Sequence, residues 1–369
     1  MFVVAQFKGK EGILLQSTKA IVRRDLTGRS TMRWGTYLKR YGTLYLLLLV
    51  PLPALGGRDG DKPGPGTSKP PSAPGSAASD ASSAPEEAST FKILNTATGE
   101  VVEMEEREFV IGTVASEMPA SYHTEALKAQ AVASYTYYSA KRARAREEPE
   151  EALKGADFAD VPATFPETYT EEGLRERWGD NFDTYYNKIC DAVDEVMGKT
   201  LTYDGELIYA AYHAISSGTT ETGVPVWSVD YPYLQSVPSP GDKLSPQYSS
   251  EASFTAEQFS TAMEGIAEGM DLSGEPSGWI AGEPERTAAG TVTALTVGGV
   301  SVTGQQVREA LGLRSACFTV AWRENGFLFT VQGYGHGVGM SQYGADYLAR
   351  QGSSYEEILH YYYTGVVLS

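Results

Sequence analysis

The chain has 369 residues, of which 41% are hydrophobic and 11% aromatic, enough for one large or two smaller domains with a packed core. The formal net charge is −17, and beyond residue 40 only 21 Lys and Arg residues stand against 45 Asp and Glu residues. Because phosphate binding needs clustered basic side chains, this balance argues against a nucleic-acid partner. Cys190 and Cys317 lie outside any CxxC spacing, which excludes a zinc ribbon or a thioredoxin-like motif and leaves their pairing open.

The N-terminal region has the pattern of a membrane-targeting segment. Residues 1–40 carry nine Lys and Arg residues against two acidic ones, and residues 41–57 form an apolar run near the lower length limit for spanning a bilayer. The basic flank predicts a cytoplasmic N-terminus and an extracytoplasmic body. The run is either a signal anchor or a cleaved signal peptide, because small residues stand at 54–56. Met32 is an alternative start to residue 1.

Residues 58–90 consist mainly of Pro, Gly, Ser and Ala, with almost no side chains to bury. Such a composition cannot offset the entropy lost on ordering, so it predicts a disordered linker. At Phe91 the pattern changes to alternating apolar residues, and the globular part is expected to run over 91–369.

The first predicted elements are a hairpin of strands over 91–95 and 99–105, followed by two helices over 106–118 and 123–146. Pro119 separates these helices, because proline cannot continue a helix from within it.

Residues 142–170 are charged and contain prolines, and they predict a loop. Further elements are a hairpin turning at Asp204-Gly205, a helix over 254–266, a hairpin and helix over 290–313, strands over 315–337 turning at Asn325-Gly326, and two helices over 340–365. Between the last two helices Gly352 is expected at a C-cap, and Ser354 with Glu357 forms a capping box. Because strands and helices do not alternate regularly, we expect a single α+β domain of helices and antiparallel hairpins.

Glu117 is the first candidate for chemistry. Val110 and Val114 lie seven and three residues before it on one helical stripe, so its carboxylate projects from an apolar face. Desolvation there raises the pKa of a carboxyl group, which suits a general acid at neutral pH. The alternative is a glutamate at a helix end that points at water.

The second candidate is the segment "GYGHGVGMSQYGA", residues 333–345, in which four glycines alternate around His336. No Lys-Ser/Thr pair follows the last glycine, which excludes a phosphate loop, and no second ligand stands at metal-binding spacing. Two interpretations remain: a tight turn that packs a strand against a helix, or a groove floor with polar contacts from His336, Gln342 and Tyr343. The tyrosine runs "SYTYYS" and "LHYYYTG" are expected in the core and in the groove wall.

The third candidate is "YHAISSGTTE", residues 212–221, which contains His213, Ser216 and Glu221. A Ser-His-acid hydrolase is disfavoured, because no GxSxG elbow is present and residues this close on a strand and turn cannot easily form a triad. A structural hydrogen-bonding role for His213 is the alternative.

Four segments together resemble the stage II sporulation protein D family, which shares its domain with amidase enhancers. The resemblance covers roughly residues 91–369. The segments are "VIGTVASEMPASYHTEALKAQAVASYTYYSAK", "YHAISSGTTE", "ERTAAGTVTALTVGGVSVTGQQVREALGLRSACFTV" and "GYGHGVGMSQYGADYLARQGSSYEEILHYYYTG".

This resemblance implies a membrane-anchored lytic transglycosylase that cleaves peptidoglycan glycan strands during engulfment, in the space between forespore and mother cell. The implied partners are an amidase-endopeptidase that removes stem peptides and other membrane-anchored engulfment proteins. In the family the glutamate of "SEMP" is the catalytic acid, here Glu117. The expected substrate-binding residues are Lys128, Gln130, His213, Ser216, His336, Gln342 and Tyr343.

One carboxyl group suffices for the implied reaction, and no cofactor is expected. Protonated Glu117 donates to the oxygen between N-acetylmuramic acid and N-acetylglucosamine, and then takes the proton of the C6 hydroxyl as this closes onto C1 in a 1,6-anhydro ring. A second carboxylate, as in standard glycosidases, is not required.

Two departures from the family pattern bear on the site. Tyr135 stands where relatives often have an arginine, and tyrosine cannot supply a guanidinium. The segment "KGADFADVPATFPETYT", residues 154–170, lacks the Cys and His residues that many relatives carry, so we predict no metal. Both departures leave room for a non-catalytic wall-binding module that enhances an amidase. A purely structural membrane-anchored protein would leave the segment around His336 unexplained.

Overall fold

The structure is a computed structural model that describes residues 89–160 and 170–369. These residues belong to one compact unit, 86–369. The predicted basic segment and apolar run, and nearly all of the predicted linker, lie outside the described residues. Within the described ranges, none of the helices is both long enough and apolar enough to cross a bilayer.

The N-terminal hairpin is formed as predicted, by β1 (Thr90–Asn95) and β2 (Val101–Glu105) in antiparallel register. A third strand, β3 (Phe158–Asp160), pairs with β1 in parallel. The prediction of a loop throughout 142–170 is therefore wrong at these residues. Three residues are too few to show a strand period, and β3 is held by its pairing and by the burial of Phe158.

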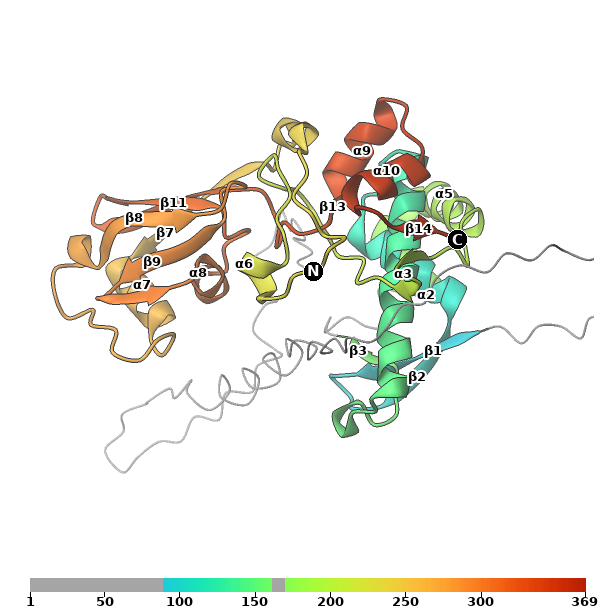
Figure 1. Cartoon of the computed structure of the whole chain (residues 1–369), viewed down its shortest axis with the longest axis horizontal. Helices are drawn as coiled ribbons and strands as arrows, with labels where there is room; N and C mark the ends of the chain where they lie inside the picture. The colour runs from blue at the N-terminus through green and yellow to red at the C-terminus, as the bar shows by residue number, and fades with distance from the viewer. Residues whose placement is uncertain (1–88, 161–169) are drawn as a thin grey trace, which may run out of the picture. The chain divides into compact units, whose positions relative to one another are not determined.

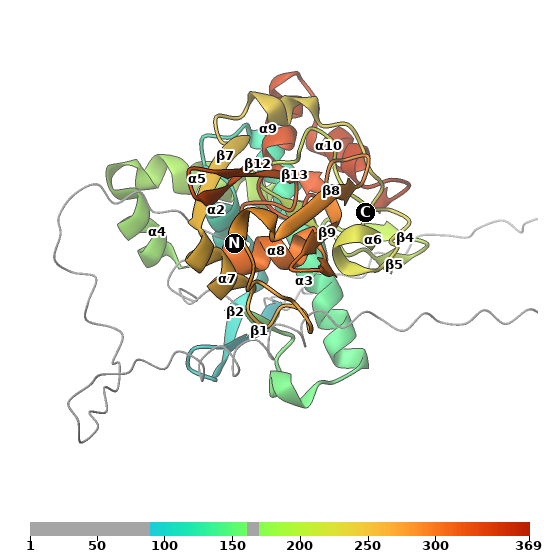
Figure 2. The same ribbon diagram turned by 90° about the vertical axis from the view of Figure 1, so that its left-hand side faces the viewer.

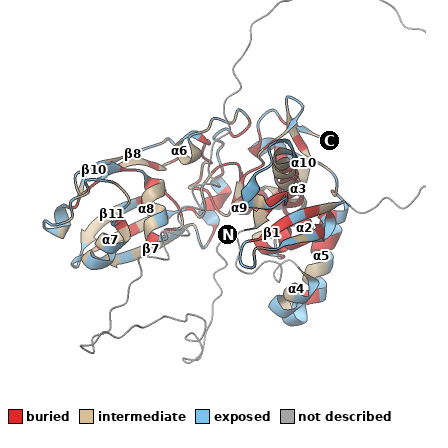
Figure 3. Cartoon of the chain, turned by 90° about the horizontal axis from the view of Figure 1, so that it is seen from below, coloured by how far each residue is buried: buried red, intermediate tan, exposed pale blue. Residues whose placement is uncertain are grey.

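Two helices follow as predicted: α2 (Glu106–Glu117) and α3 (Thr124–Glu147). They pack against each other and against α5 (Phe182–Asp194), for which the sequence analysis predicted no helix. The short helix α4 (Glu171–Trp178) buries only Leu174 and is otherwise exposed or partly exposed, as Figure 3 shows. The α3 helix is lined with small buried residues, which let its neighbours approach closely.

The second half of the unit contains a sheet lobe, residues 249–332, with its own hydrophobic core. Figures 1 and 2 show its two antiparallel sheets, ordered β11-β12-β7 and β10-β9-β8, with α7 and α8 beside them. The elements are β7 (Ser249–Thr255), α7 (Ala256–Met263), β8 (Ile280–Arg286), β9 (Val292–Val297), β10 (Val300–Val302), α8 (Gly304–Leu311), β11 (Phe318–Arg323) and β12 (Gly326–Gln332).

The turn between β11 and β12 lies one residue earlier than predicted. Arg323 pairs with Gly326, so the two turn residues are Glu324 and Asn325, with φ of 49° and 65°. The left-handed conformation of both residues matches a hairpin turn of type I′, for which asparagine is well suited.

The chain returns from the sheet lobe to the helices through a short parallel ladder. Strand β6 (Tyr212–His213) pairs with β13 (Met340–Ser341), so the two segments singled out around His213 and His336 lie side by side. The remaining elements are β4 (Leu201–Tyr203), β5 (Glu206–Leu207), α6 (Val224–Trp227), α9 (Gln342–Arg350), α10 (Tyr355–Tyr362) and β14 (Val367–Leu368).

The caps predicted near the C-terminus are confirmed: Ser354 and Glu357 form a capping box, and Gly352 has a φ of 100°. The mixed α+β class is also confirmed. The pairs β1–β3 and β6–β13 are parallel, however, so the strands are not arranged only as antiparallel hairpins.

Candidate active site

Glu117 is the last residue of α2, at the point where the helix leaves the core. Val110 and Val114, on the same stripe, are 1% and 0% exposed, and the following residue, Met118, is 2% exposed. Met118 has an extended conformation, and its N–H still bonds to the Val114 carbonyl. The Glu117 side chain itself is half-buried, and its neighbours on the helix are apolar.

Two glutamine side chains connect Glu117 with α3 and α9. Gln342, the first residue of α9, donates from Nε2 to Glu117 Oε2 and to Gln130 Oε1, each at 3.3 Å. Gln130 in turn donates to Ser134 Oγ at 3.0 Å. Gln130 and Gln342 are 0% and 4% exposed, so Glu117 is held by a buried amide chain with no charged group in it.

Burial raises the pKa of Glu117, and the hydrogen bond from Gln342 offsets only part of this rise. An uncharged amide stabilises a carboxylate far less than a cation does, so desolvation outweighs it. Glu117 is thus poised to carry a proton at a higher pH than an ordinary glutamate.

Tyr137 links the neighbourhood of Glu117 with a cluster of aromatic rings. Burial raises the pKa of the Tyr137 phenol, and the charge of Glu117 adds to that rise, so the phenol is within electrostatic reach of the carboxylate. The Tyr137 hydroxyl lies 2.9 Å from that of Tyr209, which packs edge-on to Trp227 and stacks on Tyr231. We define the aromatic cluster as Tyr137, Tyr209, Trp227, Tyr231 and His336.

His213 and His336 both form hydrogen bonds to the backbone of Val338. His213 Nδ1 donates to the Val338 carbonyl at 3.1 Å, and the Val338 N–H donates to His336 Nδ1 at 3.1 Å. Burial lowers the pKa of His213 to about 4 and also lowers that of His336, so both rings are neutral near pH 7. Among the described residues the buried Nε2 atom of His213 has no hydrogen-bond partner.

The glycine-rich segment packs tightly against β6. A Cβ atom on Gly339, whose φ is 72°, would lie 2.1 Å from the Ala211 carbonyl oxygen, so only glycine fits there. The same segment places the His336 ring 5.0 Å from Trp227. The tight-turn interpretation thus holds at Gly339, while His336 contributes to the aromatic cluster.

Ser216 belongs to a buried network behind the site. Its N–H and hydroxyl both donate to Asp242, which is 0% exposed and also accepts from the Ser341 hydroxyl at 2.7 Å. Ser341 caps α9 by accepting from the Gly344 N–H, and so fixes the start of the helix that presents Gln342. Because Ser216 bonds to Asp242 and not to His213, the hydroxyl is not arranged as in a hydrolase triad.

Asp242 has no sequence signal that marks it as part of a site. It is a lone acidic residue in a polar loop, and nothing in "SPGDKLS" shows that three serine side chains converge on it. Tyr209, Trp227 and Tyr231 have no local signal for a similar reason. Tyr209 and Tyr231 lie in loops and Trp227 ends the four-residue helix α6, and they come together only through contacts distant in sequence.

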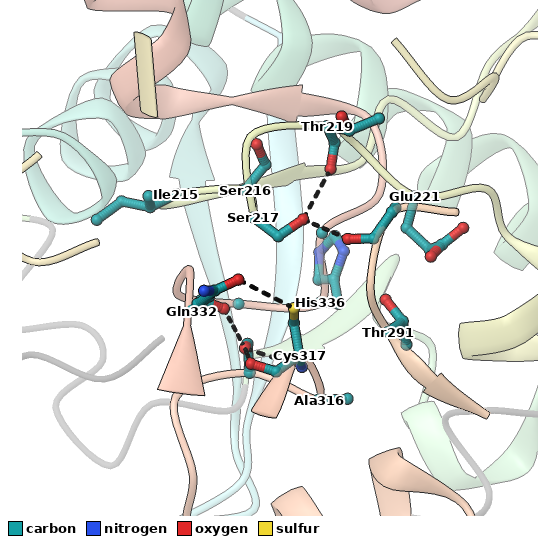
Figure 4. A pocket seen from close by; sticks show the side chains of 14 residues that line it. Ile215, Ser216, Ser217, Thr219, Glu221, Thr291, Ala316, Cys317, Gln332 and His336 are labelled. Atoms are coloured by element: carbon teal, nitrogen blue, oxygen red, sulfur yellow. Dashed lines mark hydrogen bonds between the residues drawn. The ribbon is translucent and has the colours of Figure 1, made fainter. Parts of the chain in front are cut away.

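His336 also lines a small cavity of about 20 Å³, large enough for one water molecule (Figure 4). Ser217, Glu221, Cys317 and His336 are among the residues that line it, and Glu117 is not. The Glu221 carboxylate accepts hydrogen bonds from the Thr222 N–H at 2.9 Å and from the Thr287 hydroxyl at 2.5 Å.

Both cysteines are free thiols, which settles the pairing that the sequence left open. Cys190 is buried in the helical core, and Cys317 lies at the small cavity. Burial raises the pKa of both thiols, so neither is an activated thiolate.

Five of the seven expected substrate-binding residues, among them Lys128 and Tyr343, lie outside the hydrogen-bond chain of Glu117. Lys128 forms ion pairs with Glu125 and Glu195, at 2.8 and 2.5 Å. Tyr343 packs edge-on to Tyr122, and its N–H bonds to the Ala214 carbonyl. Of the expected residues, Gln342 bonds to Glu117 directly and Gln130 is linked to it through Gln342. Contact of any of the expected residues with substrate stays a prediction.

Tyr135, at the position of the family's arginine, points away from Glu117. Its hydroxyl donates to Glu106 at 2.8 Å, and Arg142 pairs with the same carboxylate. Glu106 is the first residue of α2 and Glu117 the last, so Tyr135 acts at the opposite end of the helix.

The predicted absence of a metal stays a prediction. Over the described residues, no three His, Cys, Asp or Glu side chains cluster as metal ligands. Part of the segment on which the prediction rests, residues 161–169, lies outside the described ranges.

Comparison with known proteins places these features in a family. Residues 95–203 match the family model described as Stage II sporulation protein. The chain is 39% identical to stage II sporulation protein D of Bacillus subtilis (strain 168), over 76% of this chain and 79% of that protein. It is 38% identical to the protein of the same name from Bacillus amyloliquefaciens, over 71% of this chain and 73% of that protein.

A more distant relative is the amidase enhancer of Bacillus subtilis (strain 168), 28% identical over 70% of this chain and 40% of that protein. The identity to the first two relatives extends over most of both chains and includes the segment with Glu117. This chain belongs to the stage II sporulation protein D family.

Proposed function

We propose that this protein is a lytic transglycosylase that cleaves the bond between N-acetylmuramic acid and N-acetylglucosamine in peptidoglycan. The observation that carries the proposal is the setting of Glu117: a half-buried carboxyl group with a raised pKa, bonded to the Gln342 amide and within electrostatic reach of the Tyr137 phenol. Aromatic faces are suited to stacking on sugar rings, and a raised pKa supplies the proton.

In the first step Glu117 acts as the general acid. Gln342 donates its N–H to Oε2, so Oε2 is the accepting oxygen and the acidic proton resides on Oε1. Transfer of this proton to the glycosidic oxygen lets the N-acetylglucosamine hydroxyl leave, as positive charge develops at C1 of the muramic acid residue.

In the second step the Glu117 carboxylate acts as the base. It takes the proton of the C6 hydroxyl while the C6 oxygen bonds to C1, which closes the 1,6-anhydro ring and restores protonated Glu117. The proton that Glu117 lost is regained and no water is consumed, so the reaction balances with one carboxyl group.

The surroundings of Glu117 support a mechanism with a single carboxyl group. Asp242 accepts a hydrogen bond from Ser341, the residue that precedes Gln342 at the start of α9. Asp242 is fully buried and its oxygens are occupied by hydroxyl and N–H donors. It is therefore not placed to activate water or to attack a sugar, as the second carboxylate of a standard glycosidase does.

The proposed setting is the cell membrane during engulfment in endospore formation, with the N-terminus in the cytoplasm and the catalytic unit between forespore and mother cell. The basic and apolar segments of residues 1–57 support this topology, and the family name supports the role in sporulation. An amidase-endopeptidase that removes stem peptides, and other membrane-anchored engulfment proteins, are the proposed partners.

A second candidate is a non-catalytic wall-binding protein that enhances an amidase. The similarity to a relative named amidase enhancer favours it. In that case the aromatic cluster would hold glycan, and Glu117 would contribute no proton.

One experiment separates these functions. The full-length protein is incubated with glycan strands free of stem peptides, and the fragments are analysed by mass spectrometry. Fragments that end in 1,6-anhydro-N-acetylmuramic acid are expected. Binding without fragments would contradict the transglycosylase and support the enhancer, and fragments with reducing ends would show hydrolysis instead.

A further inference from the structure

One stripe of α3 extends from the neighbourhood of Glu117 to a positively charged end. Gln130, Ser134, Tyr137, Lys141 and Arg144 follow at spacings of three and four residues, so they share one face of the helix. At 1.5 Å per residue, Lys141 and Arg144 lie about 16 and 21 Å along the axis from Gln130. The stripe therefore passes from the amide chain of Glu117, over Tyr137, to two cations.

Lys141 packs on the aromatic cluster, and Arg144 follows it three residues later on the same face of α3. The Lys141 ammonium lies over the Tyr137 ring, 5.0 Å from its centre. Burial raises the pKa of Tyr209, and the charge of Lys141 counteracts this; Arg144 acts in the same way on Tyr231. The two cations are thus within electrostatic reach of the rings on which sugars would stack.

The neighbouring arginines of α3 face elsewhere. Arg142 pairs with Glu106, and Arg146 lies 3.5 Å from Asp157 near β3. Arg144 has a weaker partner, the exposed Glu148 at 3.8 Å, and such an exposed pair contributes little. The helix therefore separates its cations into a pair that binds the N-terminal sheet and a pair that faces the aromatic cluster.

We propose that Lys141 and Arg144 form a carboxylate-binding subsite for the glycan strand, beyond the aromatic cluster as seen from Glu117. The inference rests on the function proposed above. Every muramic acid residue carries a lactyl group, whose carboxylate is free when no peptide is attached, while a stem peptide carries its own carboxylates. Lys141 lies over the Tyr137 ring, so a sugar bound at the aromatic cluster would bring its lactyl carboxylate close to the Lys141 ammonium. The chain is strongly acidic and would repel an anionic polymer, so these two cations would provide local attraction for it.

The test compares full-length variants on three substrates. The variants are Lys141→Gln, Arg144→Gln, the double variant, and Arg146→Gln as a matched control on the same helix. The substrates are peptide-free strands, the same strands with their carboxyl groups converted to methylamides, and strands that carry stem peptides. Rates of cleavage are measured at low and moderate salt, because screening weakens exposed charge pairs.

On peptide-free strands we expect the double variant to lose about ten-fold in kcat/KM, from two partly exposed charge-assisted contacts. On methylamidated strands the wild-type protein should be as slow as the double variant is on free strands. The double variant should cleave free and methylamidated strands at the same rate. Arg146→Gln should behave as wild type on each substrate. The same dependence seen only on peptide-bearing strands would assign the carboxylate to the peptide.

Equal losses of the double variant on free and amidated strands, or wild-type rates on all substrates, would overturn the subsite. If the wild-type protein cleaves no substrate, the proposed function fails instead. Cosedimentation of the same variants with the same insoluble strands then tests the subsite by itself, and binding that ignores both the cations and the carboxylates would overturn it.

Discussion

The helix α2 begins with Glu106 and ends with Glu117, and the pKa values of these two glutamates are shifted in opposite directions. Burial raises the pKa of Glu106, but hydrogen bonds from Ser89, Arg142 and Tyr135 outweigh this and lower it. Burial also raises the pKa of Glu117, and there the side-chain donor that offsets it among the described residues is the amide of Gln342. Both carboxyl groups lose water, so the difference comes from their partners: a guanidinium fixes a carboxylate, and an amide leaves a proton in place.

This comparison indicates a division of roles along one helix. Glu106 anchors the start of α2 to α3, and Glu117 keeps a transferable proton at the end that meets α9. Tyr135 belongs to the anchored end, where Arg142 supplies the positive charge.

The largest expected effect follows from replacing the proton donor. Glu117→Gln keeps the shape and the contact with Gln342 but removes the acid, and general acid-base catalysis contributes about 10²–10⁴-fold. We expect cleavage to fall by at least that range while glycan binding is retained. The control is Glu108→Gln, an exposed position on the same helix, which should cleave as wild type. Full activity of Glu117→Gln would contradict the mechanism.

Glu106→Gln tests the anchored end. It leaves the partly buried Arg142 guanidinium without its counter-charge, and breaking a fully buried pair costs about 3–5 kcal/mol. We expect the free energy of unfolding, measured by urea denaturation, to fall by the lower part of that range. The rate per folded molecule should be unchanged. A loss of activity without a loss of stability would contradict the division of roles.

The two ends of α2 should also respond to opposite pH limits. Glu117 works as an acid, so the rate should fall as pH rises through its raised pKa. Glu106 has a lowered pKa, so it stabilises the fold above the ordinary glutamate pKa, and this stability is lost as pH falls through the folded-state value. The checks are a pH-rate profile and urea denaturation at several pH values, with Glu106→Gln removing the acid-side loss.

Gln342→Leu sharpens the comparison from the other side. The Gln342 N–H lowers the pKa of Glu117, so its removal should raise that pKa further and move the alkaline limb of the pH-rate profile upward. Gln130 also loses a donor, and we expect about a ten-fold loss of rate at the optimum, the scale of one buried hydrogen bond to a reacting group. A limb that moves downward would mean that Gln342 acts through something other than this bond.

Tyr135→Phe should have the smallest effect. It removes one hydrogen bond to Glu106 and should cost about 1 kcal/mol of unfolding free energy, with no change in rate. Tyr185→Phe, on α5 and also half-buried, is the control for the loss of a tyrosine hydroxyl. A rate that falls with Tyr135→Phe would place this residue in the site after all.

The parts of the fold that sequence patterns predicted are those with a local signal. The helices on either side of Pro119, the turn at Asp204-Gly205 and the capping box at Ser354 follow from neighbouring residues. Strand β3 is too short to have a period, and the ladder of β6 with β13 joins segments more than a hundred residues apart, so neither could be predicted from local patterns.

The candidate site was predictable to the same extent. Glu117 and Gln342 stand in motifs with a recognisable pattern, whereas Asp242 and Trp227 gain their places only through the folded structure. The run "LHYYYTG" shows the limit clearly: Tyr362 and Tyr363 are 1% and 0% exposed and belong to the core, while the rings beside Glu117 come from other segments.

The most direct test of the account is cleavage of peptide-free glycan strands by the full-length protein in water enriched in oxygen-18. If Glu117 alone moves the proton and the C6 oxygen closes the ring, the new ends are 1,6-anhydro sugars without the isotope. New reducing ends that contain oxygen-18 would show that water attacks C1, and would contradict the mechanism with a single carboxyl group.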